Sequence, residues 1–230
     1  MATKKTQQED PEVVIESAIG RAEGFIERNA KSLTYIAIAI IVIVCGYFGW
    51  KYLYAIPREG KAADAMFVAE QLFIAEDYQQ ALDGDGNNEG LLEVIDQWGS
   101  TAHGNLARQY AGICYMKLDK PEEALDVLSK YKTSKGAPNV IVNAQNFGLR
   151  GDLLAKQGKD KEALDMYRKA IAAAENSLTT PFYLKKAGIL SEKTGDFAGA
   201  KAFYQRIADE FGMSMEARDI EKSIGRAEQL

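Results

Sequence analysis

The sequence has few of the residue types from which catalytic and metal sites are built. Its 230 residues include one histidine, His103, and two cysteines, Cys45 and Cys114. One histidine cannot supply a histidine-based metal site or triad, and Cys45 lies inside an apolar run, so we expect no disulfide. We expect Cys114 to be a small buried helix residue. No nucleophile beside a base, paired-acid pocket or phosphate loop is recognisable, so we expect neither an enzyme nor a cofactor.

The sequence also lacks an excess of positive charge. The formal net charge is −5, and lysine and arginine do not cluster, which argues against nucleic-acid binding. The loop DGDGNN begins like a calcium-binding loop, with Asp83, Asp85 and Asn87 alternating. The sixth position is Asn88 instead of glycine and the twelfth is Val94 instead of glutamate. We therefore predict a polar turn and no metal.

Charge is absent altogether from one long stretch. Between Lys31 and Lys51 the chain reads SLTYIAIAIIVIVCGYFGW, which is 19 residues and enough for a helix of about 28 Å, close to the thickness of a bilayer core. Aromatic residues crowd its far end, as at a headgroup interface. A cleaved signal peptide fits less well, because 31 residues of mixed charge precede the run. A lipoprotein signal would need small residues before Cys45, and a buried core helix would need more apolar partners than the rest of the chain offers. Residues 32–54 are therefore predicted to be an uncleaved transmembrane anchor.

Within this anchor, Cys45, Gly46 and Gly49 lie on neighbouring turns. Small residues let a second transmembrane helix approach closely, so these three form a candidate docking face. The alternative is that they have no special role, since small residues are common in membrane helices.

The segment before the anchor is polar at first and then periodic. Residues 1–9 are expected to be disordered. Residues 10–31 are predicted to form an amphipathic helix, with Asp10 as N-cap, Pro11 as first residue and a bend near Asn29. The apolar stripe consists of Ile15, Ala18, Ile19, Ala22, Phe25 and Ile26. We expect this helix to lie on the membrane surface or on a partner, the alternative being an ordinary surface helix.

After the anchor, residues 103–212 contain a repeat. From each of Gly112, Gly151 and Gly188, an alanine follows at twelve residues and a large residue at sixteen. These are Ala124, Ala163 and Ala200, and then Leu128, Tyr167 and Tyr204. The pairs resemble those of tetratricopeptide (TPR) units, in which small residues let two helices pack and the large residue fills the gap. We predict three degenerate TPR units, the alternative being a plain helical bundle.

The fold is thus predicted to be all-α, a transmembrane helix followed by a TPR-like solenoid. Residues 55–102 should form a long helix, Glu59 to about Leu82, paired with a helix at 89–99 ahead of the first repeat. Residues 213–230 should form a capping helix.

The first helix of each unit usually lines a concave wall, so it supplies the candidate groove. The predicted groove residues are Gln109, Ile113, Lys117, Gly148, Asp152, Lys156, Lys185, Ile189 and Lys193. A lysine ends each first helix, which either offers a basic edge to an acidic peptide or simply complements the helix dipole. The two-carboxylate clamp of chaperone adaptors needs asparagine at the positions that Ile113, Asp152 and Ile189 occupy here. We therefore do not expect a chaperone adaptor of that kind.

The order of parts resembles one family of membrane proteins. The stretch GFIERNAKSL, the run ending GYFGWKYLY, HGNLARQYA from His103 and the repeats are similar to the YfgM-type ancillary subunits of the bacterial Sec translocon. Within the membrane entry, the similar residues are Phe25, Glu27, Asn29, Lys31, Gly46, Gly49, Trp50 and Tyr52. The resemblance implies a single-pass inner-membrane protein with a periplasmic domain. Its implied partners are translocon subunits and a membrane-bound periplasmic chaperone.

Charge does not decide the orientation. Arg21, Arg28 and Lys31 before the anchor balance Lys51, Arg58 and Lys61 after it. A TPR scaffold or receptor whose domain faces the cytosol is therefore the alternative function.

Overall fold

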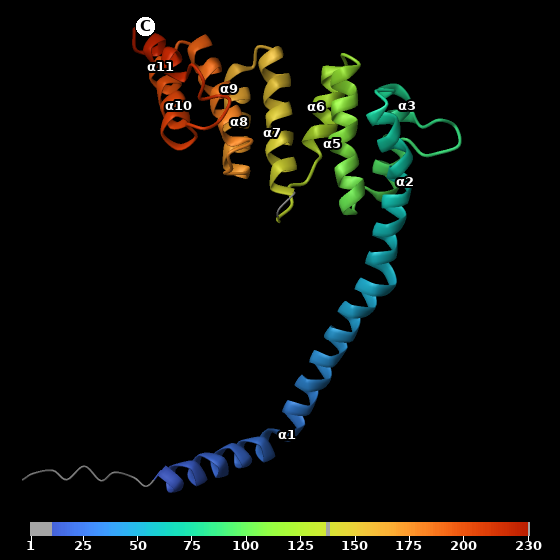
Figure 1. The fold of residues 1–230 in the computed structure, drawn as a ribbon. Helices are drawn as coiled ribbons and strands as arrows, with labels where there is room; N and C mark the ends of the chain where they lie inside the picture. The colour runs from blue at the N-terminus through green and yellow to red at the C-terminus, as the bar shows by residue number, and fades with distance from the viewer. Residues whose placement is uncertain (1–10, 137–138, 230) are drawn as a thin grey trace, which may run out of the picture. The chain divides into compact units, whose positions relative to one another are not determined.

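The computed structural model describes residues 11–136 and 139–229, and every regular element in them is a helix (Figure 1). The all-α prediction is confirmed. The chain divides into two compact units, Met1–Pro57 and Arg58–Leu230, which we call the stem and the solenoid and describe separately. The predicted disordered residues 1–9 and the Asp10 N-cap lie outside the described residues.

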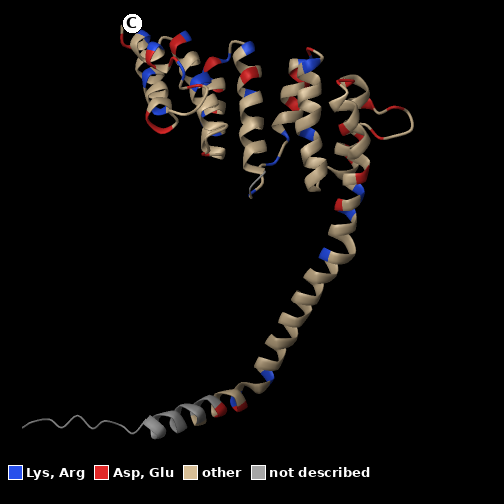
Figure 2. Ribbon diagram, viewed as in Figure 1, with Lys and Arg blue, Asp and Glu red and all other residues tan. Residues whose placement is uncertain are grey.

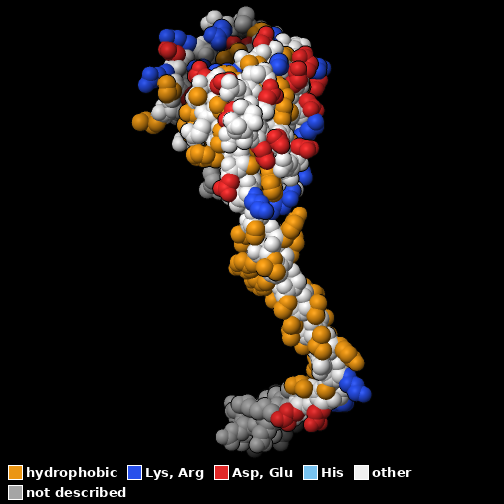
Figure 3. All heavy atoms as spheres, turned by 90° about the vertical axis from the view of Figure 1, so that its right-hand side faces the viewer, with side chains coloured by type: hydrophobic (Ala, Val, Ile, Leu, Met, Phe, Trp, Pro, Cys, Tyr) orange, Lys and Arg blue, Asp and Glu red, His pale blue; other side chains and the backbone are white. Residues whose placement is uncertain are grey.

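The stem is helical through its described length. Helix α1 covers Pro11–Trp50, a π-helical turn η1 covers Lys51–Ala55, and α2 begins at Ile56. Glu23–Ile74 is the one helical stretch in the described part of the chain that is long and apolar enough to cross a membrane. Hydrophobic side chains cover the middle of the stem (Figure 3), and Figure 2 shows no charge there. The stem thus contains a candidate membrane span.

The predicted bend near Asn29 falls within α1, which has no break there. Three side chains nearby bond back to the carbonyl one turn earlier: Arg28 to Gly24, Asn29 to Phe25 and Thr34 to Ala30, at 2.8–2.9 Å. Such bonds compete with the backbone ladder and favour bending of a helix.

The solenoid is a row of helices that runs from α2 to α11 (Figure 1). The bounds are α2 Ile56–Ile74, α3 Tyr78–Asp83, α4 Leu91–Trp98, α5 Ala102–Lys117, α6 Pro121–Ser129, α7 Asn139–Lys156, α8 Asp160–Ala173, α9 Thr180–Lys193, α10 Phe197–Glu210 and α11 Ile220–Gln229. Helices α5 and α6, α7 and α8, and α9 and α10 form the three predicted hairpins.

Each hairpin closes with the same turn, and this turn occurs four times. A residue with positive φ ends the first helix, and the next N–H donates to the carbonyl five residues back, which is a Schellman motif. The residues with positive φ are Glu76, Asp119, Gly158 and Gly195. The bonds are Asp77 to Leu72, Lys120 to Tyr115, Lys159 to Leu154 and Asp196 to Ser191, each 2.9–3.0 Å. The solenoid therefore contains a fourth hairpin, which α2 opens.

Small and large residues pack within the hairpins as the repeat pattern predicted. The alanines at Ala124, Ala163 and Ala200 have no exposed surface. A Cβ atom added to Gly112, Gly151 or Gly188 would collide with the side chain sixteen residues later, which is Leu128, Tyr167 or Tyr204 respectively. The glycine is needed because the large side chain occupies the space of its missing Cβ.

The first hairpin departs from the predicted single helix over residues 59–82, which was wrong. Helix α2 ends at Ile74 and α3 begins at Tyr78 after the turn. Counted from the turn, Ala69 and Ala81 take the glycine and alanine positions, and both are fully buried. The large-residue position falls at Asp85, inside the DGDGNN loop. This loop interrupts the second arm of the hairpin and divides it into α3 and α4.

The C-terminal capping helix is shorter than the predicted segment. Residues 213–219 form turns, and α11 starts at Ile220, after Asp219 with its positive φ of 60°. Ile220, Ile224 and Ala227 are buried against the preceding hairpin. Only these last ten residues act as a packed cap.

The core of the solenoid is not continuous. One large cluster lies in α7–α11, a second lies in α2–α5, and a small one around Ala124, Leu128 and Leu153 lies between them. We call α2–α6 the N-terminal block and α7–α11 the C-terminal block.

Candidate functional site

The predicted groove residues all lie on the first helices α5, α7 and α9, but they have different surroundings. Gln109 is only 4% exposed, and its Oε1 accepts a hydrogen bond of 3.0 Å from Asn146 Nδ2. Gly148 is buried beneath the ring of Tyr183. These two residues belong to the packing between hairpins and cannot contact a partner directly.

The lysines that end the first helices contact other parts of the solenoid. Lys156 pairs with Asp119 at 2.7 Å, and Lys193 pairs with Asp160 at 2.8 Å. The ammonium of Lys117 lies 5.9 Å from the centre of the Tyr78 ring. Each lysine thus connects its helix to the preceding hairpin, a role that neither the basic-edge interpretation nor the helix-dipole interpretation included.

Asp152 is held in a similar polar contact. Its carboxylate lies 2.6 Å from the Lys186 ammonium and accepts a hydrogen bond of 2.7 Å from the Tyr167 hydroxyl. Burial, together with this carboxylate, raises the pKa of Tyr167 far above its usual value. Asp152 therefore stabilises the junction between α7, α8 and α9.

Besides these lysines, the first helices also expose large apolar side chains. Four large side chains on first helices are well exposed: Phe67 by 60% and Ile74 by 67% on α2, Phe182 by 42% and Ile189 by 52% on α9. Ile113 on α5 and Lys185 on α9 are half-buried. We call Phe67, Ile74, Ile113, Phe182, Lys185 and Ile189 the first-helix face.

A hollow lies over α7 between α6 and α8. It has a volume of about 650 Å³. Leu125, Leu154 and Met166 give it an apolar floor, and four carboxylates line it: Glu122, Asp126, Glu162 and Asp165. Arg150 also lines it; its Nε is buried without a hydrogen bond among the described residues, and burial lowers its pKa.

Sequence reasoning did not identify this hollow, although one signal was present. Arg150 directly precedes Gly151, whereas the equivalent residues before Gly112 and Gly188 are Ala111 and Ala187. Both alanines are fully buried. A long cationic side chain at a position that is otherwise a buried alanine therefore indicates that α7 borders a hollow at this position.

The loops at one end of the solenoid are joined by polar contacts. The Glu59 carboxylate accepts hydrogen bonds of 2.9 Å from the backbone N–H groups of Ala102 and His103 and so caps α5. Asn105 on α5 bonds both backbone groups of Lys132, at 2.7 and 2.9 Å. A hollow of about 480 Å³ lies between these loops.

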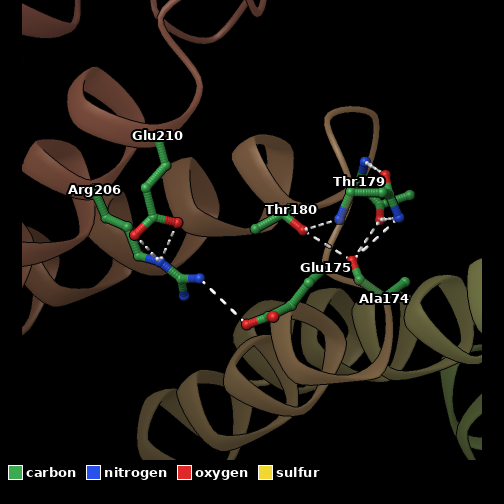
Figure 4. A network of polar contacts seen from close by, with 7 residues as sticks. Ala174, Glu175, Thr179, Thr180, Arg206 and Glu210 are labelled. Atoms are coloured by element: carbon green, nitrogen blue, oxygen red, sulfur yellow. Dashed lines mark hydrogen bonds and ion pairs between the residues drawn. The ribbon is translucent and has the colours of Figure 1, made fainter.

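In the C-terminal block, the loop between α8 and α9 lies at the same end, and Figure 4 shows its polar contacts. The Ala174 carbonyl accepts a hydrogen bond of 2.8 Å from the Thr180 hydroxyl. Arg206 on α10 bonds Glu210 at 2.9 Å and reaches Glu175 at 3.4 Å. The loop between α8 and α9 is therefore fixed to the C-terminal end of α10.

The described residues contain no group of three or more histidine, cysteine, aspartate or glutamate residues that could hold a metal ion. In the DGDGNN loop, the Asp85 carboxylate accepts hydrogen bonds from the N–H groups of Asn87 and Asn88.

Cys114 is buried, and burial raises the pKa of its thiol to about 12, which suppresses its reactivity.

The predicted docking face of the stem lies on α1. Cys45 is exposed, and a Cβ added to Gly46 or Gly49 would meet nothing within 4 Å. The face is open to an approaching helix, and its role in docking stays a prediction.

Comparisons with known proteins agree with the repeat pattern. A family model described as a tetratricopeptide repeat-like domain matches residues 59–186, and this match begins with α2. No curated protein matches the chain significantly.

Two solved structures are similar in fold. The MamA protein has 18% identity and a TM-score of 0.52, with 73% of this chain and 81% of that chain covered. A putative kinesin light chain of Podosopora anserina with nearly identical TPR-like repeats has 12% identity and a TM-score of 0.54, with 74% and 86% covered.

Proposed function

Because the chain belongs to the tetratricopeptide repeat-like family, we propose that it is a membrane-tethered protein–protein interaction module without enzymatic activity. The observation that carries this proposal is the first-helix face. Its four well-exposed large apolar side chains lie on helices that the repeat fold commonly uses for binding. Exposed apolar residues on such a surface favour a protein partner.

The charges around this face indicate how it would select a partner. Asp152, Lys156 and Lys193 are paired within the solenoid, so a partner gains little from them. Recognition would depend on apolar side chains seated against Phe182 and Ile189, with Lys185 near the edge. The expected ligand is therefore a peptide segment with spaced apolar residues, and acidic character would be secondary.

The finer proposal concerns the cellular process. The resemblance to YfgM-type translocon subunits supports a single-pass protein of the bacterial inner membrane with a periplasmic solenoid. In this role it would assist Sec-dependent translocation and transfer emerging proteins to periplasmic chaperones. Cys45, Gly46 and Gly49 would be the place where the stem meets a translocon helix. The alternative is a scaffold or receptor whose solenoid faces the cytosol.

Site-specific photo-crosslinking in native membranes tests the interaction face. A crosslinker at Ile189 should capture translocon subunits or envelope chaperones, whereas one at exposed Gln205 on second helix α10 serves as the control. Replacing both Phe182 and Ile189 with serine should weaken capture at least tenfold, the loss of about 1.4 kcal/mol. Equal capture at both positions would reject the first-helix face, and capture of cytosolic proteins alone would favour the alternative.

Topology is tested separately by protease accessibility. In intact spheroplasts, added protease should digest the solenoid while the N-terminal segment stays protected. Protection of the solenoid would place it in the cytosol and would exclude the translocation role without affecting the binding face.

A further inference from the structure

The loops at the end of the solenoid where the first helices begin form a surface that differs in composition from the opposite end. It comprises residues 99–101, 130–136, 174–179 and 211–219, which we call the loop rim. We propose that the loop rim rests on a bilayer surface that contains anionic lipids. The proposal rests on the proposed function in one respect, because it requires the stem to span that bilayer.

The hydrogen bonds determine where the chain enters the solenoid. Glu59 caps α5 at Ala102 and His103, and Glu70 accepts a 2.7 Å hydrogen bond from Tyr110 further along. Helices α2 and α5 therefore run in the same direction, and α2 enters the solenoid at the loop rim.

The connection to the candidate span is short. Tyr54, the last of the aromatic residues expected at the headgroup interface, is followed by only three residues before the solenoid begins at Arg58. Even fully extended, such a connection covers only about 14 Å. The entry point of the solenoid is therefore held near the headgroups.

The side chains of the loop rim match such a surface. Three of its large apolar side chains are well exposed: Leu178 by 70%, Met215 by 73% and Met213 completely. Lys132 and Lys135 are exposed in the loop before α7, and Lys61 is exposed on the first solenoid turns of α2. Lysine attracts anionic headgroups, and exposed apolar tips can enter the interface.

The acidic groups of the loop rim are largely paired within the protein. Of its three carboxylates, Glu175 contacts Arg206 and Asp219 lies 2.7 Å from Lys222, while Glu216 is half-buried. These pairs reduce the repulsion that unpaired carboxylates would create against an anionic surface.

The opposite end has a different composition. Its four turns, at residues 75–77, 118–120, 157–159 and 194–196, contain no exposed large apolar side chain. They carry Glu76, Asp77, Asp119 and Asp196 against Lys120 and Lys159. Among the loops and turns compared, exposed large apolar side chains thus occur only in the loop rim, at the end through which the chain enters the solenoid, which favours a membrane as the occupant.

Tethering makes weak contacts sufficient. A short link to the bilayer gives the loop rim an effective concentration in the millimolar range or above. Two lysines that each contribute about a fivefold preference for an anionic surface would then decide whether the rim is docked.

The test uses the full-length protein in lipid nanodiscs. Cys45 is replaced by serine, buried Cys114 is retained, and a fluorophore is attached at Ser177→Cys in the loop rim. Thr194→Cys at the opposite end is the matched control. The lipids carry a headgroup quencher and are either phosphatidylcholine alone or a mixture with phosphatidylglycerol.

We expect stronger quenching at position 177 than at 194, and more with phosphatidylglycerol than without. Replacing Lys132 and Lys135 with glutamine should lower the docking equilibrium constant roughly thirtyfold, the conversion of two lysine contributions, whereas Lys120→Gln with Lys159→Gln should not. High salt should weaken the docked state.

Equal quenching at the two positions, or no response to phosphatidylglycerol, would overturn the proposal. Quenching at position 177 that occurs only after a membrane extract is added would identify a protein as the occupant and would also overturn it. Failure of the protein to integrate into nanodiscs would instead reject the membrane anchor itself.

Discussion

The junction between α8 and α9 and the junction between α6 and α7 join the same kind of hairpin in different ways. At the first, Leu184 and Ala187 are fully buried in one apolar cluster that continues to α11. At the second, Gln109 and Asn146 meet in a buried hydrogen bond, and Arg150 opens a hollow beside α7. The apolar clusters separate at this second junction.

The difference shows which part of a repeat is constrained. Within each complete hairpin the glycine and its large partner are retained, because one fills the space left by the other. Between hairpins, alanine can become arginine if a hollow replaces close packing. We therefore interpret the solenoid as two rigid blocks joined at a polar and less tightly packed junction.

Exchanging residues between the junctions should give the largest effect. Ala187→Arg places a cation in a fully packed position and should lower the free energy of unfolding by about 4 kcal/mol or more. Arg150→Ala, its matched control, should change it by less than about 1 kcal/mol because the position borders a hollow. Guanidinium unfolding of the full chain in micelles, followed by circular dichroism, measures both. Similar losses for the two variants would show that the junctions are equally tight.

A glycine comparison should give an intermediate effect. Gly188→Ala pushes a Cβ into the Tyr204 ring and should cost about 2 kcal/mol. Gly112→Ala also collides with a buried side chain, but Leu128 is smaller than the tyrosine ring, so the cost should be lower, about 1 kcal/mol; the helix propensity that alanine recovers is the same in both variants. The same unfolding measurement applies. A larger loss for Gly112→Ala would show that the contact with Leu128 is the tighter of the two.

The smallest effect is expected at the start of the N-terminal block. Burial raises the pKa of Glu59, but the hydrogen bonds from Ala102 and His103 together lower it by more. The pKa of Glu59 therefore lies below its ordinary value. Glu59→Gln should cost about 1 kcal/mol at neutral pH, a modest figure because the carboxylate is partly exposed.

The sign of the pH dependence follows from this lowered pKa. The Glu59 contribution is complete above the ordinary glutamate pKa of about 4.3 and is lost as the pH falls through the lower folded-state value. The stability difference between wild type and Glu59→Gln should therefore shrink in acid. A constant difference from neutral to acid pH would mean that the charge of Glu59 is not what caps α5.

The three later hairpins could be predicted because their small and large residues keep fixed spacings. The first hairpin was predicted as a divergent unit, but its turn was placed after Leu82 instead of at residues 75–77, for a physical reason. Ala69 replaces the glycine, and the large-residue position falls in the inserted loop at Asp85, so two of the three markers are absent. Ala69 and Ala81, twelve residues apart like each glycine and alanine pair, were the remaining signal.

The candidate groove was predicted at the level of helices and not of side chains. The lysines were correctly placed at the ends of first helices, but spacing along one helix does not reveal a partner in another hairpin. The pairs Lys156 with Asp119 and Lys193 with Asp160 depend on how neighbouring hairpins stack. The burial of Gln109 likewise depends on Asn146, which lies 37 residues away.

The turn at Glu76, Asp119, Gly158 and Gly195 gives the solenoid a modular length. Because each copy closes its hairpin with the same backbone bonds, the stretch between two copies is a unit that could be deleted or duplicated in register. Such a change would leave the entry through α2 and the cap α11 intact and would alter only how far the binding face extends along the solenoid. Reach is thus a property that this chain could change in whole steps, independently of what it binds.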